Sequence, residues 1–414
     1  MATAKQIFCG VFSVGLIIHV YYLLTTLPSV YKSVKMTNNH KGAHDPPPSR
    51  LFHSKVLSTN TKLLTSDQTT TDKKISPNSS ASEGQCHYRV QLIGSRGFRR
   101  LNAKNIRCAN HCNLELSVAD GKKLLEGMDA VVFILMTTLT RLAAPANPTQ
   151  AWIYHSRENP RNAGRGFTLP VHATWTYHPG SEISARYGFY EPGVPMTNQT
   201  KSPEEWVEGK SKLVAWISSN CHNTFWPRTA FVHELTKLIP IDMYGRCGNL
   251  KCDKTRKCSV DLLHQYKFYL SLENTECGDY ITEKFWGKPL QQGAVPIVNG
   301  APRKVYEELA PPNSFIYVGD YKNMKELADY LKLLDSKPEL YANYLEWRYK
   351  GRSIAVPNPR WTPSAFCKVI PIIEKVKRGE LKRVPVRNSQ FAKSCRAPNR
   401  GQPVSTFGVK WVPW

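Results

Sequence analysis

The chain has 414 residues, of which 41% are hydrophobic and 11% aromatic, so a wholly disordered protein is excluded. A chain of this length is expected to form about two domains. The formal net charge of +24 indicates anionic partners such as phosphates, acidic glycans or a membrane surface. Composition alone excludes neither nucleic acid nor a basic surface that is only solvated.

The first apolar segment, residues 7–27, has no charged side chain apart from His19 and is long enough to cross a bilayer as a helix. A removable signal peptide has a shorter apolar core, and the TTLPSVYK that follows is a poor cleavage site. We therefore expect a signal-anchor at residues 7–27 after a cytosolic tail of residues 1–6. Lysines after the segment favour the opposite orientation, but the rest of the chain favours a short cytosolic N-terminus.

Residues 28–85 are predicted to be a disordered stem that precedes the globular part. Their Ser-, Thr-, Asn- and Lys-rich composition offers too little apolar surface to offset the entropy of ordering. Asn78 in the stem and Asn198 further along lie in N-x-S/T sequons, and both are glycosylation sites if this part of the chain is luminal.

Ten cysteines follow Cys9, and an even number is typical of disulfides in an oxidising compartment. Cys247, Cys252 and Cys258 are alternatively a candidate zinc site. Their spacing is irregular, and no histidine lies close by before His264, which disfavours zinc without excluding it.

Two globular regions follow the stem. The first, residues 86–208, contains short apolar runs that predict strands at 129–138 and 150–156. The second, residues 209–370, alternates strand and helix patterns, which predicts an α/β fold with a parallel sheet of Rossmann type. Residues 371–414 are expected to form a basic tail on the surface. The expected strands of the second region are 212–219, 241–245, 268–273, 294–299 and 314–318, and its helices are 228–239, 279–292 and 324–334.

The most informative stretch is residues 266–300, YKFYLSLENTECGDYITEKFWGKPLQQGAVPIVNG. A helix that begins at Asp279 would place Tyr280, Glu283 and Lys284 on one face of its first turn. The free N–H groups and positive end of a helix suit a diphosphate, and a neighbouring carboxylate suits ribose hydroxyls. The alternative is that these are ordinary surface charges. No GxGxxG sequence is present, so a dinucleotide is not indicated.

This stretch resembles the signature of the α1,3-fucosyltransferases, glycosyltransferase family 10, which is close to YKFYL-x-FEN-x(4)-DYITEK followed by VPVV-x-G. Leu272 replaces an aromatic residue and Ile297 a valine. The likeness covers about residues 130–350 and is weaker in the first region. It implies a GT-B architecture of two Rossmann-like domains, in which residues 86–208 bind the acceptor and residues 209–370 bind GDP-fucose.

The resemblance also implies the donor-binding side chains. At the matching positions of this chain a lysine and a tyrosine contact the phosphates and the sugar, a glutamate holds ribose, and an arginine grips the diphosphate. The residues implied are Arg228, Asn274, Tyr280, Glu283 and Lys284.

Transfer from GDP-β-L-fucose into an α linkage inverts the anomeric carbon, which requires a base for the proton of the acceptor hydroxyl. In the family that base is a glutamate in a segment that matches residues 155–160, HSRENP, and Glu158 is therefore the predicted general base. Arg157 and Asn159 depart from the commoner residues of that segment. Glu182 is the second candidate, and a loop carboxylate paired with a neighbouring arginine is the structural alternative.

No DxD motif stands at a strand end, so no obligatory metal ion is expected, and stimulation by manganese is left open. Lys284 and Arg228 are expected to provide the positive charge that a metal ion otherwise provides. Arg246 and Arg256 are the competitors for the role of Arg228.

The sequence thus predicts an inverting α1,3-fucosyltransferase of the Golgi membrane, with its catalytic part luminal. Its expected partners are GDP-fucose, a glycan acceptor on a glycoprotein or glycolipid, and the membrane through the N-terminal helix, with no nucleic acid. The alternatives are a transferase for another GDP-sugar, an inert glycan-binding homologue, and a secreted basic protein that binds heparan or nucleic acid. Core-type and Lewis-type acceptors, and an additional α1,4 activity, are not distinguished by the sequence.

Overall fold

The computed structural model describes residues 86–94, 98, 101, 103–109, 111–119, 126–134, 147–163, 167–197, 200–222, 224–251, 262–359 and 362–396. All of them belong to one compact unit that spans Ser80–Trp414. The predicted anchor, the stem and both sequon asparagines, Asn78 and Asn198, lie outside the described residues. Among the residues described, no helix is long and apolar enough to cross a membrane.

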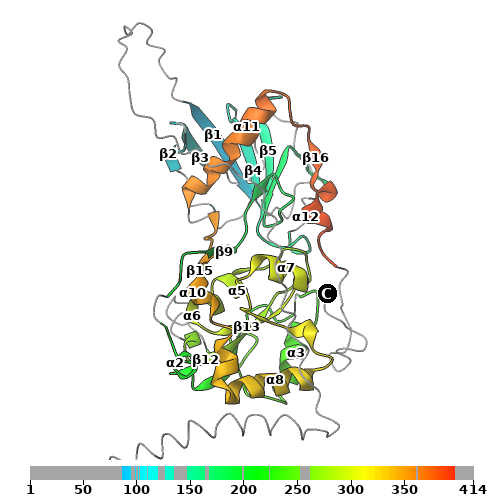
Figure 1. Ribbon diagram of the computed structural model, residues 1–414. Helices are drawn as coiled ribbons and strands as arrows, with labels where there is room; N and C mark the ends of the chain where they lie inside the picture. The colour runs from blue at the N-terminus through cyan, green and yellow to red at the C-terminus, as the bar shows by residue number, and fades with distance from the viewer. Residues whose placement is uncertain are drawn as a thin grey trace, which may run out of the picture. The chain divides into compact units, whose positions relative to one another are not determined.

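The first region forms a seven-stranded sheet in the order β2-β3-β1-β4-β5-β7-β8 (Figure 1). Every pairing in it is parallel except that of β2 with β3. Alternate residues of β4 enter two different core clusters, so both faces of the sheet are covered, as is usual for parallel sheets. The strands are β1 His87–Gly94, β2 Ala103–Arg107, β3 Asn113–Ala119, β4 Ala130–Ile134, β5 Ala151–Ser156, β7 Ala173–Thr176 and β8 Ile183–Ser184.

The second region forms a five-stranded sheet in the order β11-β10-β12-β13-β14, with every pairing parallel. The predicted parallel α/β sheet is therefore confirmed. The strands are β10 Lys212–Ile217, β11 Ile241–Tyr244, β12 Tyr266–Leu272, β13 Val295–Asn299 and β14 Ile316–Tyr317. The main helices are α2 Pro203–Val207, α3 Arg228–Leu235, α5 Glu283–Trp286, α6 Pro289–Gln292, α7 Arg303–Leu309, α8 Met324–Ser336, α9 Pro338–Ala342 and α10 Trp347–Lys350.

Local sequence accounts for where several of these helices begin. Ser202 and Glu205 form a reciprocal capping box at α2. At α8 the Asn323 side chain accepts a hydrogen bond from the Glu326 N–H, and the apolar residues of this helix face the core of the second sheet. The helix between β12 and β13 is not the single one predicted over 279–292, because it is divided into α5 and α6.

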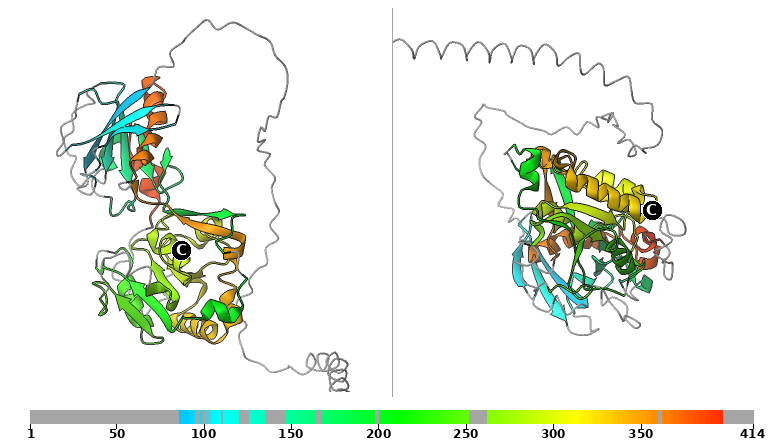
Figure 2. Two further views of the ribbon diagram at one scale, coloured as in Figure 1. Left: turned by 90° about the vertical axis from the view of Figure 1, so that its left-hand side faces the viewer. Right: turned by 90° about the horizontal axis from the view of Figure 1, so that it is seen from below.

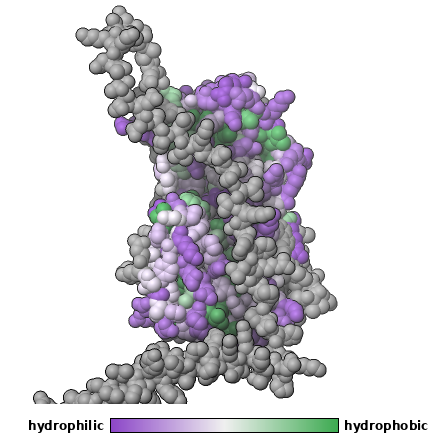
Figure 3. Space-filling model, in the orientation of Figure 1, coloured by the Kyte–Doolittle hydropathy of each residue, from purple (hydrophilic) through white to green (hydrophobic). Residues whose placement is uncertain are grey.

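After α10 the chain returns to the first region. β15 Gly351–Ala355 pairs antiparallel with β9 Gly188–Pro192, and α11 Ile370–Lys377 lies against the first sheet, as Figures 1 and 2 show. Ile372, Ile373 and Val376 of α11 are buried in the core beneath that sheet. The segment from residue 371, which we expected to be a surface tail, thus contributes apolar side chains to the first core. On the face shown in Figure 3, the described surface is predominantly hydrophilic.

Four disulfides lie within the described residues, as the even number of cysteines predicted. They are Cys86–Cys112, Cys108–Cys367, Cys221–Cys247 and Cys277–Cys395. The zinc alternative loses its first ligand, because Cys247 is disulfide-bonded, while Cys252 and Cys258 lie outside the described residues. No group of three or more His, Cys, Asp or Glu side chains with metal-binding geometry occurs in the described part of the chain.

Candidate functional site

Glu158 lies in the loop that follows β5, at the carboxyl end of the first sheet. All six residues of β5 are buried, so the strand holds the start of this loop rigidly. The Ser156 hydroxyl accepts a hydrogen bond from the Glu158 N–H at 3.1 Å and donates one to the Glu158 carbonyl at 3.0 Å. The backbone of Glu158 is therefore fixed while its side chain remains partly exposed.

The Glu158 carboxylate meets a tyrosine of the second region. The Tyr280 hydroxyl donates a hydrogen bond to Glu158 Oε2 at 3.2 Å across 122 positions of sequence. The Tyr280 ring is buried and packs against Tyr177 and Tyr187, with centroids 4.9 and 6.3 Å away. Burial raises the pKa of the Tyr280 hydroxyl well above its ordinary value, so it stays a donor toward the carboxylate.

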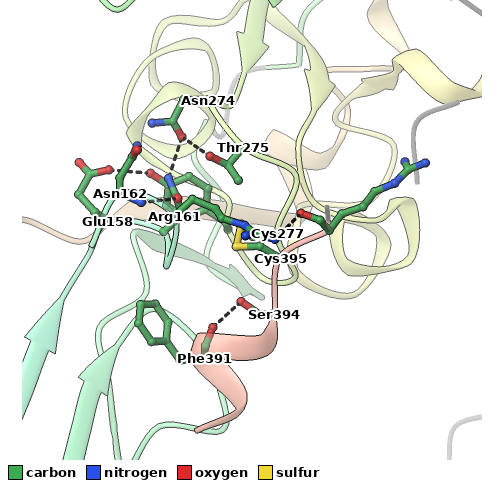
Figure 4. Close-up of a disulfide and its surroundings, with 12 residues drawn as sticks. Glu158, Arg161, Asn162, Asn274, Thr275, Cys277, Phe391, Ser394 and Cys395 are labelled. Atoms are coloured by element: carbon green, nitrogen blue, oxygen red, sulfur yellow. Dashed lines mark hydrogen bonds between the residues drawn. A yellow bond between two sulfur atoms is a disulfide. The ribbon is translucent and has the colours of Figure 1, made fainter. Parts of the chain in front are cut away.

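A second contact joins the same two loops. The Asn159 side-chain amide donates to Asn274 Oδ1 at 3.0 Å, and both side chains are buried. Asn274 follows β12, and its carbonyl accepts from the Phe225 N–H at 2.8 Å. Figure 4 shows the loop with Glu158 and Asn162 next to the loop with Asn274 and Thr275. Asn159 was noted in the sequence only as a departure from the family segment, and its contact with Asn274 gives it a structural function.

Lys284 stands between two carboxylates. Its Nζ lies 3.0 Å from Glu273 Oε2, 2.9 Å from Thr282 Oγ1 and 3.3 Å from Glu283 Oε1. Burial opposes the charge of Lys284, but the attraction of Glu273 and then Glu283 outweighs it and raises the pKa of the ammonium. The site therefore holds a permanent, partly accessible positive charge.

Glu273 is the site residue that sequence reasoning missed. Its side chain is 1% exposed, accepts hydrogen bonds from the Thr282 N–H and hydroxyl, and forms the ion pair with Lys284. Burial raises the pKa of the Glu273 carboxyl, an effect that the Lys284 charge opposes. The signal was present in the sequence, since this glutamate directly precedes Asn274 in the matched segment.

The predicted helical face at this site is wrong in one respect. Helix α5 begins at Glu283, with the Thr282 hydroxyl accepting from the Lys284 N–H, and Tyr280 precedes it in a turn, where its N–H donates to the Cys277 carbonyl. Asp279 has a positive φ of 59°, which turns the chain just before Tyr280. Tyr280 thus points to Glu158 from a turn, while Glu283 and Lys284 project from the start of a four-residue helix.

Arg228 is buried at the start of α3. It donates to the Leu272 carbonyl at 2.7 Å, the Asn220 carbonyl at 2.9 Å and the Ser218 hydroxyl at 3.3 Å. These bonds tie the carboxyl ends of β10 and β12 together. The terminal nitrogens of Arg228 are therefore committed to protein acceptors, and its predicted grip on a diphosphate remains a prediction.

The other candidates are placed less favourably. Glu182 Oε2 accepts from the Thr174 N–H at 2.6 Å and from its hydroxyl at 2.9 Å, which occupies that carboxylate in holding β7. His155 is buried, and burial lowers its pKa to about 4, so it is neutral at physiological pH. Arg246 is exposed after β11, and Arg256 lies outside the described residues.

The Cys277–Cys395 disulfide attaches the C-terminal segment to the loop that carries Tyr280 (Figure 4). On either side of it, the Gly278 N–H donates to the Ser394 carbonyl at 2.8 Å and the Arg396 N–H to the Glu276 carbonyl at 3.0 Å. Phe391, in the same segment, packs in the cluster that contains Tyr280. The disulfide therefore restrains the loop that carries Tyr280.

Replacing both Cys277 and Cys395 by Ser is expected to lower the free energy of unfolding by about 2–4 kcal/mol, because the bond closes a long loop. It is also expected to lower kcat, because the loop that carries Tyr280 loses a restraint. The control is the double Ser variant of Cys86 and Cys112, a pair distant from Tyr280 in the fold, which should lose stability but keep kcat. Denaturant unfolding and steady-state kinetics measure both, and equal kcat values for the two variants would contradict the positioning role.

The chain is similar in sequence to known proteins. The family model for glycosyltransferase family 10 (fucosyltransferase), C-terminal part, matches residues 207–385. Glycoprotein 3-alpha-L-fucosyltransferase A of Drosophila melanogaster is 38% identical over 219 residues, which are 52% of this chain and 43% of that protein. Alpha-(1,3)-fucosyltransferase fut-1 of Caenorhabditis elegans is 34% identical over 231 residues, 54% of this chain and 53% of that protein. The chain thus spans about half the length of these two relatives.

Alpha-(1,3)-fucosyltransferase 7 of Bos taurus is 33% identical over 267 residues, which are 63% of this chain and 73% of that protein. The chain therefore belongs to glycosyltransferase family 10, the fucosyltransferases. A solved structure of an α1,3-fucosyltransferase with GDP is similar to 73% of this chain and 94% of its own, at 18% identity and a TM-score of 0.47.

Proposed function

We propose that the protein is an inverting α1,3-fucosyltransferase that transfers L-fucose from GDP-β-L-fucose to the 3-hydroxyl of a GlcNAc residue in a glycan. The observation that carries the proposal is the Glu158 carboxylate held by the Tyr280 hydroxyl at 3.2 Å, at the junction of the two sheets. Family membership supports GDP-fucose as the donor.

In the proposed reaction, the acceptor oxygen forms a bond to the anomeric carbon of fucose while the bond from that carbon to the diphosphate oxygen breaks. Glu158 takes the proton of the acceptor hydroxyl, and GDP leaves with the electron pair of the broken bond. Lys284 lies in the first turn of α5. We assign to its ammonium group the stabilisation of the negative charge that develops on the diphosphate. Asn274 and Glu283 are the other proposed donor-binding residues, and Glu283 is assigned to the ribose hydroxyls.

We propose further that the architecture is of the GT-B type, with residues 86–208 binding the acceptor and residues 209–370 the donor. The two sheets, which are parallel except for the β2–β3 pairing, support this division, and so does the contact between Glu158 and Tyr280, which joins a loop from each sheet. No obligatory metal ion is assigned to the reaction, and the cationic site around Lys284 supports that assignment.

The proposed location is the Golgi membrane, with residues 7–27 as the anchor, 28–85 as the stem and Asn78 and Asn198 as glycosylation sites. The four disulfides support an oxidising compartment for the globular part. If this is right, the full chain stays in the membrane pellet after alkaline carbonate extraction, and peptide N-glycosidase lowers its apparent mass. Release into the supernatant would contradict the anchor.

The function is tested by incubating residues 86–414 with GDP-fucose and a panel of neutral acceptors that contain core N-glycan GlcNAc or N-acetyllactosamine. Mass spectrometry should detect the addition of one deoxyhexose to at least one of them, and the acceptor used defines the subclass. GDP-mannose in place of GDP-fucose is the donor control. Unchanged GDP-fucose across the whole panel would contradict the proposal and favour a glycan-binding homologue without catalysis.

A further inference from the structure

The loop between β7 and β8 is fixed by hydrogen bonds among its own residues. The Thr176 hydroxyl accepts a hydrogen bond from the His178 N–H at 3.2 Å and shares another with the Ser181 hydroxyl at 2.5 Å. The Ser181 N–H donates to the His178 carbonyl at 3.1 Å. His178 therefore stands in a short turn whose backbone is held on both sides of it.

The C-terminal segment packs against the same loop. The Phe391 ring lies 5.5 Å from the Tyr177 ring, measured between centroids, and the Gln390 side chain lies against Gly180. Tyr177 is fully buried. The loop is therefore supported by packing as well as by its own hydrogen bonds.

Two consecutive residues of this loop meet two consecutive residues of the second region. The Tyr177 ring packs against the Tyr280 ring with centroids 4.9 Å apart. Beside this contact, His178 Nε2 lies 3.9 Å from Asp279 Oδ2, and their side chains are only 13% and 21% exposed. The two regions are thus joined directly beside Tyr280, the residue that donates to Glu158.

The proton of the neutral His178 ring lies on the nitrogen that faces Asp279. Burial lowers the pKa of His178, although the Asp279 charge opposes this effect, so the ring is neutral at physiological pH. Its Nδ1 accepts a hydrogen bond from the Gly180 N–H at 3.0 Å. A neutral imidazole that accepts at Nδ1 carries its proton on Nε2. His178 therefore presents an N–H dipole to the Asp279 carboxylate, which attracts it without a direct hydrogen bond at this distance.

Asp279 has a backbone conformation that residues with a side chain rarely adopt. Its φ is 59°, which costs free energy even though Asp tolerates this region better than most residues. Three groups act on its carboxylate: His178 and Arg186 of the first region attract it, and Glu308 of α7 repels it. The attraction from the first region therefore helps to hold the turn that precedes Tyr280.

We propose that His178 is a positioning residue for the transfer reaction, and that its contact with Asp279 fixes the turn from which Tyr280 reaches Glu158. The proposal rests on the transferase function proposed above, in which Glu158 is the base. His178 acts through Asp279 and Tyr280 and not on the substrates. When the turn shifts, the Tyr280 hydroxyl moves and the Glu158 carboxylate loses its alignment with the acceptor hydroxyl. Small errors of this kind lower the rate of the chemical step more than they weaken substrate binding.

The test compares the steady-state kinetics of variants of the full chain. In His178→Ala, kcat is expected to fall about fivefold while the KM for GDP-fucose stays unchanged, because the turn loses its partner. His178→Gln should keep most of kcat, since the Gln amide also presents an N–H to Asp279. Asp279→Asn keeps a residue that tolerates the positive φ but removes the charge, so its kcat should fall as well. Adding His178→Ala to Asp279→Asn should cause no further loss, because the contact is already absent.

His172→Ala is the matched control. His172 is also a partly buried histidine of the first region, and its Nδ1 likewise accepts a main-chain hydrogen bond, from the Trp152 N–H at 2.9 Å. Its kcat should stay close to that of the unmodified protein. A loss of kcat in His172→Ala as large as that in His178→Ala would overturn the proposal, since it would indicate a general loss of structure.

Hydrogen exchange without substrates separates this proposal from the transferase function. The Tyr280 and Ile281 N–H groups donate to the carbonyls of Cys277 and Asp279, so their exchange reports the state of the turn. We expect faster exchange at these two amides in His178→Ala than in the control. If no protein fucosylates any acceptor, the transferase proposal fails, and the exchange difference would still support the hold of His178 on the turn. Equal exchange in all proteins, or faster exchange with an unchanged kcat, would overturn the positioning role.

Discussion

Replacing Glu158 by Gln is expected to lower kcat for fucose transfer by about 10²–10⁴-fold. The amide of Gln has nearly the same shape and still accepts the hydrogen bond of Tyr280, which donates to Glu158 at 3.2 Å. It is unable to take the proton of the acceptor hydroxyl. The loss should therefore appear in kcat, with little change in the KM for GDP-fucose or in the free energy of unfolding. Steady-state kinetics with both substrates varied measures this split.

Glu182→Gln is the control for this prediction, because Glu182 was the second candidate base and its carboxylate bonds to Thr174 instead. We expect its kcat to stay close to that of the unmodified protein. A kcat loss in Glu182→Gln as large as that in Glu158→Gln, or full activity in Glu158→Gln, would show that the base is assigned to the wrong residue.

Replacing Lys284 by Met is expected to lower the free energy of unfolding by about 3–5 kcal/mol, because it leaves the buried Glu273 carboxylate without its cation. Glu273 has a raised pKa in the folded protein and binds its proton more tightly there than in the unfolded chain. The stability of the variant should therefore fall as the pH rises from about 4.3, the ordinary value of Glu, through the folded-state pKa. At lower pH the difference from the unmodified protein should shrink. Denaturant unfolding over this pH range measures the effect.

The double variant Glu273→Gln/Lys284→Met separates folding from catalysis. It contains no unpaired buried charge, so most of the lost stability should return. Its kcat should remain about 10²–10³-fold low, because the charge assigned to the departing diphosphate is absent. Lys288→Met is the control, since Lys288 bonds to the Tyr269 hydroxyl instead of to a carboxylate. A double variant with full activity would show that Lys284 serves only the fold.

Much of the α/β fold could be predicted because it follows from local patterns. The predicted runs at 129–138 and 150–156 include strands β4 and β5, and the alternation in the second region gives five parallel strands. Short apolar runs bounded by loop residues are a strong signal for buried strands. The expected helix 279–292 is divided in the structure, because Gly287 and Pro289 interrupt it. The prediction gave more weight to the apolar spacing on both sides of these two residues, which is typical of one helix.

The site was partly predictable. The matched segment 266–300 indicated Tyr280 and Lys284, the segment 155–160 indicated Glu158, and the structure brings Tyr280 and Glu158 into contact. The sequence did not indicate that Arg228 donates its hydrogen bonds to main-chain carbonyls. The direction of a buried side chain depends on strands that are distant in sequence. Glu273 was missed for a related reason, since its role arises from the turn that returns Thr282 and Lys284 to it.

The residue order along the chain was enough to establish the family, the parallel sheets and the segments that carry charge and hydrogen-bonding groups, because these depend on local periodicity and motif spacing. Three-dimensional packing was required for everything that joins remote segments. It pairs Cys277 with Cys395, places α11 under the first sheet and sets His178 against Asp279. These contacts depend on how buried surfaces and loops close over more than a hundred residues, and no local pattern contains that information.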